Sequence, residues 1–162
     1  MRAIDRLRRS PVLVGWLIAS PTPWRDSWLA IRMGAWAVAI PLLKHLLPLP
    51  ALVRIMWKDA RRTQRDRKRE QRVVRLADWL SRAANLTTRG PCLTRSLLAY
   101  RFLSELDAAP RLMVAFRRSD NRAIAGHAWV VVDGKAIGER PDDLNEFLPA
   151  VSFGPRGRVV PL

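Results

Sequence analysis

The sequence predicts an α+β fold in which a helix bearing the only cysteine packs on a small antiparallel sheet, preceded by an N-terminal helical arm. Apolar residues recur at helical spacing as far as Leu106, and the spacing changes to that of strands after Pro110. Asp133-Gly134, between two apolar runs, is a strong hairpin signal. A chain of 162 residues can bury one core. We expect the arm at 1–72 and the core at 73–162.

The arm begins with apolar sequence. Arg32 and Lys44 interrupt the apolar segment from Trp28 to Leu47, and its longest uncharged stretch, Met33 to Leu43, has only 11 residues. A membrane-spanning helix needs about 20 apolar residues. We therefore interpret the segment as a buried or partner-facing helix, kinked at Pro41. Peripheral contact with a membrane is left open.

The second part of the arm is strongly basic. A helix is expected to follow Pro48 and Pro50 and to run through Trp57 into Arg61 to Arg72, which holds seven Lys or Arg and two acids. It then becomes amphipathic, with apolar residues at helical spacing (Val73, Leu76, Ala77 and Leu80). No aromatic residue lies between 58 and 74, so a nucleic-acid interface lacks stacking groups there. A solvated helix or a surface for an acidic partner fits better, and the net charge of +15 attracts polyanions and anionic membrane surfaces.

Cysteine usage and the N-terminus indicate the compartment. A single cysteine cannot form an internal disulfide, which favours a reducing environment. Met1 to Ala19 has a basic start and an apolar run, as a signal peptide does, but the run is short and no A-x-A cleavage site follows. We expect a cytoplasmic protein, with membrane association as the alternative.

The core is expected to begin with a helix and to continue as a sheet. The turn-rich segment Thr87 to Pro91 leads into a helix over Cys92 to Leu106. Strands are predicted over Leu112 to Phe116 and Ala125 to Val132, and a third strand follows the hairpin at Lys135 to Ile137. The tail from Pro141 has apolar residues that can dock against the sheet (Phe147, Leu148, Val151 and Phe153).

Cys92 is the candidate nucleophile. Pro91 is pre-organised for a helix start, so the thiol should lie in the first helical turn. Unpaired backbone N–H groups and the helix dipole stabilise an anion there, which favours a nucleophilic thiolate, and the same groups can serve an oxyanion. By itself, a cysteine at a helix start is more often a small buried hydrophobe.

A histidine must supply the other half of the chemistry. The chain has two, and His45, beside Lys44 in the apolar arm, is interpreted as structural. His127 lies in Gly126 to Val130, at the start of an otherwise apolar strand, where an imidazole requires a reason. A strand histidine alone is more often structural, but the pairing with Cys92 predicts a general base.

A third residue should orient the imidazole, and a carboxylate does this well. Asp133, a turn residue, and Glu139, on the returning strand, are the two candidates on the hairpin, and we favour Glu139. A strict two-residue turn pairs position 139 with 128 and points its side chain away from His127. A three-residue loop pairs it with 129, so this assignment predicts a bulged turn.

Other uses of these residues are less well supported. A zinc site needs three or four clustered ligands, and Cys92, His127 and Glu139 are too few. The sequence has no Gly-rich phosphate loop and no G-x-S-x-G elbow, and we expect no cofactor and no metal. A non-enzymatic basic scaffold or nucleic-acid-binding protein, and an acyltransferase using the same three residues, are the alternatives left open.

Together these residues resemble a known family. Gly90-Pro91-Cys92-Leu93-Thr94-Arg95-Ser96-Leu97, then Gly126 to Val130, Asp133-Gly134 and Glu139, are similar to the lasso-peptide leader peptidases, over about Val73 to Phe153. These are transglutaminase-like cysteine proteases, here in the stand-alone form of the microcin J25-processing type. The resemblance implies a papain/transglutaminase-like core, with Cys92 as nucleophile, His127 as general base and then acid, and Glu139 as orienting carboxylate. The family more often has Asp in that last place.

The resemblance also implies a pathway and partners. The enzyme would be a bacterial one that removes the leader from a ribosomally made precursor peptide, after which an ATP-dependent, asparagine-synthetase-like lasso cyclase closes the ring. A small PqqD-like leader-binding protein would present the leader. Leader peptides are often acidic, so the basic stretch Arg61 to Arg72 is a hypothesis for the surface that contacts the substrate, its carrier or the cyclase.

Overall fold

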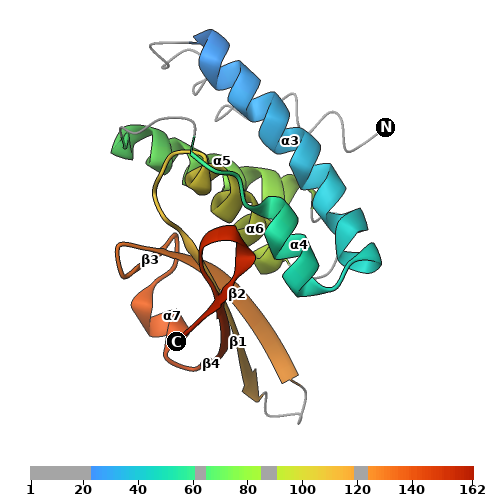
Figure 1. Cartoon of the computed structure of the whole chain (residues 1–162), viewed down its shortest axis with the longest axis vertical. Coiled ribbons are helices and arrows are strands. Elements are labelled where there is room, and N and C mark those ends of the chain that lie inside the picture. Colours follow the sequence, from blue (N-terminus) through green and yellow to red (C-terminus); the bar gives the residue numbers. More distant parts are fainter. Residues whose placement is uncertain (1–22, 61–64, 85–90, 119–123) are drawn as a thin grey trace.

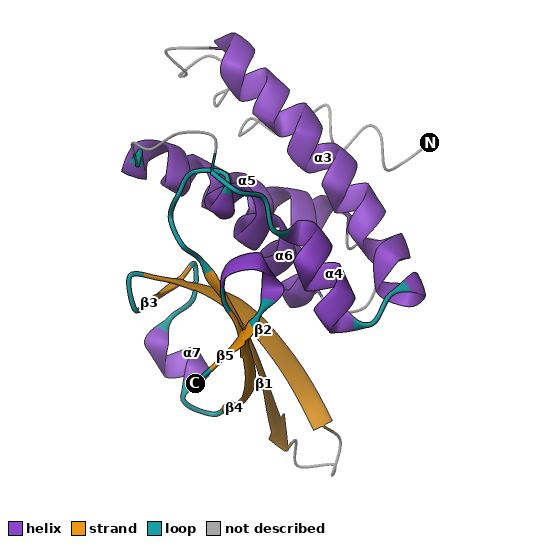
Figure 2. Ribbon diagram, viewed as in Figure 1, coloured by secondary structure: helices purple, strands orange, loops and turns teal. Residues whose placement is uncertain are grey.

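Helices make up the first part of the chain and strands the last part (Figure 2). The computed structural model describes residues 23–60, 65–84, 91–118 and 124–162. Its helices are α3 (Pro23–Leu46), α4 (Leu49–Met56), α5 (Arg67–Ala84), α6 (Pro91–Ser104) and the short α7 (Pro141–Leu144), with a 3-10 turn, η1 (Pro155–Gly157). Its strands are β1 (Arg111–Arg118), β2 (Ile124–Val132), β3 (Lys135–Ile137), β4 (Leu148–Phe153) and β5 (Val159–Val160). The predicted α+β class is confirmed, and β1, β2 and β3 contain the three predicted strands.

The described strands form one antiparallel sheet in the order β3-β2-β1-β4-β5. Helix α6 packs on β2 and β1, α5 packs on α6, and α3 lies across α5 and α6 on the side away from the sheet (Figure 1). The helix that carries Cys92 is therefore enclosed between the sheet and the other helices. Its Leu97, Leu98, Tyr100 and Phe102 are fully buried, and they form the centre of the core.

The second expected helix is two separate helices, which corrects the prediction of one that runs through Trp57. Helix α4 ends at Met56, residues 57–60 are not helical, and α5 begins at Arg67. The Trp57 ring packs on Tyr100 with ring centroids 5.5 Å apart, and the backbone N–H of Lys58 donates to Ser104 Oγ at 3.1 Å. The Lys58 N–H, which would bond to a backbone carbonyl in a continuous helix, is thus satisfied by α6, and the helix does not continue past this point.

Helix α3 is apolar on two opposite faces. Its buried face packs on α5 and α6 (Leu29, Met33, Ala37 and Ile40), whereas its other face is exposed (Trp28, Ile31, Val38, Leu42 and Leu46). Arg32 lies at the edge of the buried face and pairs with Glu105 at 2.5 Å. Pro41 lies inside the helix. By length and composition alone, Ser27–Leu46 is a segment that can cross a membrane, and 22% of its most apolar part is buried inside the protein.

The tail joins the sheet and is tied to α6 by Tyr100. Strand β4 pairs with β1, so the predicted docking of the tail occurs by strand addition, with Phe153 buried and Leu148 77% exposed. The buried Tyr100 hydroxyl donates to the Gly154 carbonyl at 2.6 Å and accepts from the Gly157 N–H at 3.1 Å. Gly157 has a φ of +66°, and a Cβ there would lie 2.8 Å from the Arg54 nitrogen, so the turn also seats against α4.

The division of the chain at residue 72 stays a prediction. Helix α5 runs through that position without interruption and packs on both α3 and α6. The predicted turn over Thr87 to Gly90 and the N-terminal apolar run lie outside the described residues, as does the start of the basic stretch at 61–64.

Replacing Tyr100 with phenylalanine is expected to lower the free energy of unfolding by about 1 kcal/mol, because the Gly154 carbonyl and the Gly157 N–H each lose a buried hydrogen bond to the hydroxyl and keep only the one between them. Val159→Ala, at a 67% exposed position of the same tail, should change it by less than about 0.5 kcal/mol. Urea denaturation followed by tryptophan fluorescence measures both. Equal midpoints for the two variants would show that the hydroxyl does not hold the tail.

Candidate active site

Cys92 lies in the first turn of α6, which begins at Pro91 as the sequence predicts. The thiol is free and partly exposed. One helical turn further on, the buried Ser96 hydroxyl donates to the carbonyl of Ala128 at 2.8 Å. This bond fixes α6 against β2 four residues after Cys92 and one residue after His127. The start of the helix and the start of the buried part of β2 therefore lie at the same end of the helix–sheet contact.

The end of α3 reaches the same helix start. Lys44, in the last turn of α3, donates from Nζ to Thr94 Oγ1 at 3.2 Å. Burial lowers the pKa of Lys44, and an electrostatic interaction with Cys92 acts in the opposite direction. The arm thus brings a positive charge to Thr94, two residues after the candidate nucleophile. Sequence reasoning did not identify it, because the spacing of 48 residues between Lys44 and Cys92 carries no local signal.

His127 and Glu139 are brought together. His127 Nε2 lies 3.3 Å from Glu139 Oε1, and the two side chains are 21% and 9% exposed. A carboxylate at one ring nitrogen orients the imidazole and leaves Nδ1 for a second partner. The imidazole ring also faces Phe147 and Trp129, with centroids 5.0 and 5.8 Å away. One of these aromatic neighbours is in the same strand as His127 and the other immediately precedes β4, and the sequence analysis assigned neither to the site.

The route by which Glu139 reaches His127 differs from the prediction. β3 pairs Val130 with Ile137 and Val132 with Lys135, so the turn at Asp133-Gly134 has two residues and no bulge, and the prediction of a bulged turn is wrong. Strand β3 ends at Ile137, and Gly138 has a φ of +75°. This left-handed residue takes the chain out of the strand, so the side chain of Glu139 does not follow the alternation of side chains between the two faces of β3. The change of direction that brings Glu139 to His127 therefore occurs after the strand and not in the turn.

Arg95 also pairs with the Glu139 carboxylate, at the same oxygen that lies next to His127. Its Nη2 forms an ion pair with Glu139 Oε1, and its Nη1 lies 3.7 Å from Asp78 Oδ1 on α5. Oε1 is buried, and its contacts with Arg95 and His127 are at ion-pair distance without hydrogen-bond geometry. Arg95 comes three residues after Cys92, a spacing that places both on one side of α6, and this was the available signal for it.

Burial is the main cause that lowers the pKa of His127 below its ordinary value. The positive charges of Arg95 and then Arg117 lower it further, whereas Asp143 raises it. The imidazole is therefore predominantly neutral at pH 7, the form that accepts a proton.

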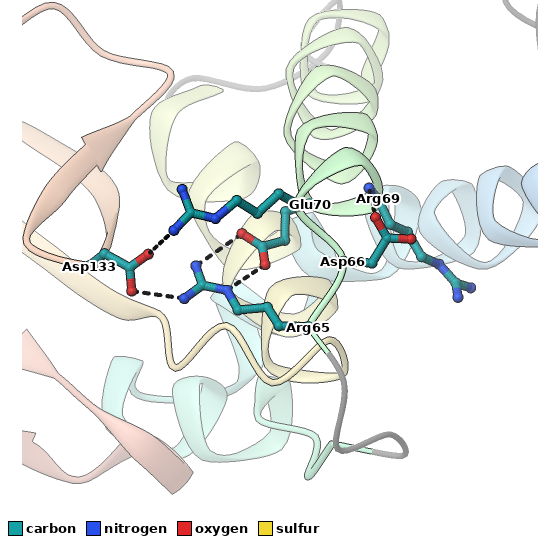
Figure 3. A network of polar contacts seen from close by, with 6 residues as sticks. Arg65, Asp66, Arg69, Glu70 and Asp133 are labelled. Atoms are coloured by element: carbon teal, nitrogen blue, oxygen red, sulfur yellow. Dashed lines mark hydrogen bonds and ion pairs between the residues drawn. The ribbon is translucent and has the colours of Figure 1, made fainter.

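Asp133, the other carboxylate on the hairpin, is engaged elsewhere. Arg65 donates to Asp133 Oδ1 at 2.8 Å and to Glu70 at 2.6 and 3.1 Å, so it bridges the hairpin and α5 (Figure 3). Hydrogen bonding to Arg65 lowers the pKa of Asp133. This geometry favours Glu139 over Asp133 as the partner of His127. Within the described ranges, no group of three His, Cys, Asp or Glu residues is placed to hold a metal ion.

Comparison with protein families finds a match. The family model described as the transglutaminase-like superfamily matches residues 35–152, which include α4, α5, α6 and the sheet as far as β4. Comparisons with curated proteins and with solved structures found no match. The matched segment contains Cys92, His127 and Glu139 as well as Lys44 and Arg95.

Replacing Arg95 with glutamine should raise the pKa of His127, because a positive charge that disfavours the imidazolium is removed. Arg95→Lys keeps the charge and should leave the pKa within about 0.3 units. Proton NMR titration of the ring signals measures this directly, since only His45 and His127 contribute and His127→Ala assigns them. An unchanged or lowered midpoint in Arg95→Gln would contradict the electrostatic role.

Two glycines offer a matched test of the position of Glu139. Gly134 and Gly138 both have a φ of +75°, so alanine at either should cost about 1 kcal/mol of stability. Only Gly138→Ala is expected to shift the NMR signals of His127, because only Gly138 directs Glu139. Identical His127 spectra in the two variants would mean that the left-handed residue is not what brings the carboxylate to the imidazole.

Proposed function

The chain belongs to the transglutaminase-like superfamily, and from that premise we propose that it is a cysteine peptidase in which Cys92 is the nucleophile, His127 the general base and acid, and Glu139 the orienting carboxylate. The observation that carries the proposal is the contact of His127 Nε2 with a buried carboxylate at 3.3 Å, on the strand that the Cys92 helix packs against. A neutral imidazole held in this way, together with a free thiol at the start of the helix that packs on the same strand, supplies the parts of an acyl-transfer site.

The proposed reaction has two stages. His127 takes the thiol proton as Cys92 Sγ attacks the peptide carbonyl carbon, and the carbonyl electron pair moves onto oxygen. When that pair returns, the C–N bond breaks, the amine leaves with the proton from His127, and a thioester remains. Water then attacks the thioester, giving its proton to His127, and the carboxylic acid and the thiol are released. Backbone N–H groups in the first turn of α6 are candidates to bind the oxyanion.

The finer assignment is a leader peptidase of lasso-peptide biosynthesis. It is supported by the family match and by the motif around Cys92, His127 and Glu139. On this proposal the substrate is a ribosomally made precursor peptide, presented in the cytoplasm by a PqqD-like leader-binding protein and passed to an asparagine-synthetase-like lasso cyclase. The exposed apolar face of α3 is a candidate surface for a membrane or one of these partners.

Acyl transfer to an amine is the second candidate, and the family match is the observation that favours it, because both reactions use the same thioester. Mass spectrometry of the product separates the two, since hydrolysis adds water to the acyl group and transfer adds the amine.

Cys92→Ala and His127→Ala should each lower cleavage of the precursor, tested together with the leader-binding protein, by at least about a thousandfold. His45→Ala is the matched control, because His45 is exposed near the end of α3, and it should keep wild-type activity. Iodoacetamide should label the protein once, at its only cysteine, with loss of activity. Full cleavage by the Cys92→Ala protein would exclude the mechanism.

A further inference from the structure

A groove separates helix α5 from the β2–β3 hairpin. Its volume is about 690 Å³, within the usual range for ligand sites. Val74 of α5, Leu103 of α6, and Val132 and Ile137 of the hairpin give it an aliphatic lining. The groove does not belong to the immediate surroundings of Cys92, and the proposed reaction does not use it.

The charged residues around this lining leave an excess of positive charge. Arg65 neutralises Glu70 and shares Asp133 with Arg67, so the two acids are already satisfied (Figure 3). Arg75 and Lys135 also line the groove, and within the described part of the chain neither forms an ion pair. Among the described residues, two cations therefore line an apolar groove without an ion-pair partner, and Asp133, on which Lys135 also acts, is already paired with Arg65 and Arg67. This arrangement attracts negative charge.

The groove leads towards the candidate active site. A second hollow of about 230 Å³ shares Val74, Arg75 and Ile137 with it and extends to Arg95 and Gly138. Arg95 pairs with Glu139, and Gly138 precedes it, so the far end of this path lies directly behind the carboxylate that holds His127. A ligand lying along α5 would thus extend from the basic end of that helix to the rear of the site.

We propose that this groove binds an acidic, extended segment of the peptide substrate, remote from the bond that is cut; the inference rests on the proposed peptidase function. Carboxylates of the segment pair with Arg75 and Lys135, and its apolar side chains cover the aliphatic lining. None of the described residues that line the groove is aromatic and able to stack on a base, which favours a peptide over a single-stranded nucleic acid. The groove gives the enzyme a means to choose its substrate outside the cleavage site.

Binding is measured in the Cys92→Ala protein, where turnover is absent. The probe is a fluorescein-labelled peptide of alternating Leu and Glu, followed by fluorescence anisotropy, with a Leu–Lys peptide and an oligothymidylate as comparison ligands. The test variant is Arg75→Glu with Lys135→Glu. Its matched control is Arg111→Glu with Arg158→Glu, an identical change in net charge at exposed positions that do not line the groove.

The acidic peptide should bind, more weakly as salt is raised, and the groove variant should weaken it about tenfold or more while the control pair changes it less than about threefold. Equal weakening by both pairs, tighter binding of the oligothymidylate or the Leu–Lys peptide, or no binding of the acidic peptide would overturn the proposal. Failure here leaves the peptidase proposal intact, because that is judged by cleavage. Loss of cleavage does not affect a binding result obtained without turnover.

Discussion

The carboxylate of Glu139 lies between two cationic or potentially cationic groups, Arg95 on α6 and His127 on β2, and the candidate site is organised around it. A carboxylate that is only 9% exposed is costly to bury unless it is paired. The pairing joins three parts of the chain: the helix that bears Cys92, the strand that bears His127 and the segment after β3. Because Arg95 also contacts Asp78, α5 is joined to the same network. Displacement of any of these elements would leave a buried charge without a partner.

Much of this arrangement follows from local sequence. Pro91 predicts the helix start that places Cys92. The hairpin predicted at Asp133-Gly134 is also confirmed, and both residues adopt the positive φ that such a turn requires. The prediction of a bulged turn is wrong because it assumed that β3 continues to position 139. A two-residue turn points position 139 away from His127 only if β3 continues, and the chain leaves the strand at Gly138 instead. A left-handed glycine after the strand and a bulge in the turn would each direct the side chain of residue 139 towards His127, and the sequence is compatible with both.

Other features depend on contacts between segments far apart in the chain, which periodicity does not report. The break after α4 arises because Trp57 packs on Tyr100 and Lys58 bonds to Ser104, more than 40 residues away. The hydrogen bond from Lys44 to Thr94 and the contact of Phe147 with the ring of His127 are of the same kind. Arg95 is the exception, since its spacing from Cys92 on one helix face was readable, but nothing in the sequence distinguishes it from the other 28 Lys and Arg residues.

The distribution of positive charge bears on how the site starts its reaction. Burial, Arg95 and Arg117 all act against a proton on His127, so they disfavour a resting imidazolium. A neutral His127 is instead ready to accept the proton at the moment of attack. The imidazolium then forms next to the Glu139 carboxylate, which stabilises it, and it is a stronger acid than an unperturbed histidine when the amine must be protonated. The same positive charges that lower the pKa of His127 thereby favour transfer of the proton from the imidazolium to the amine, on which release of the amine depends.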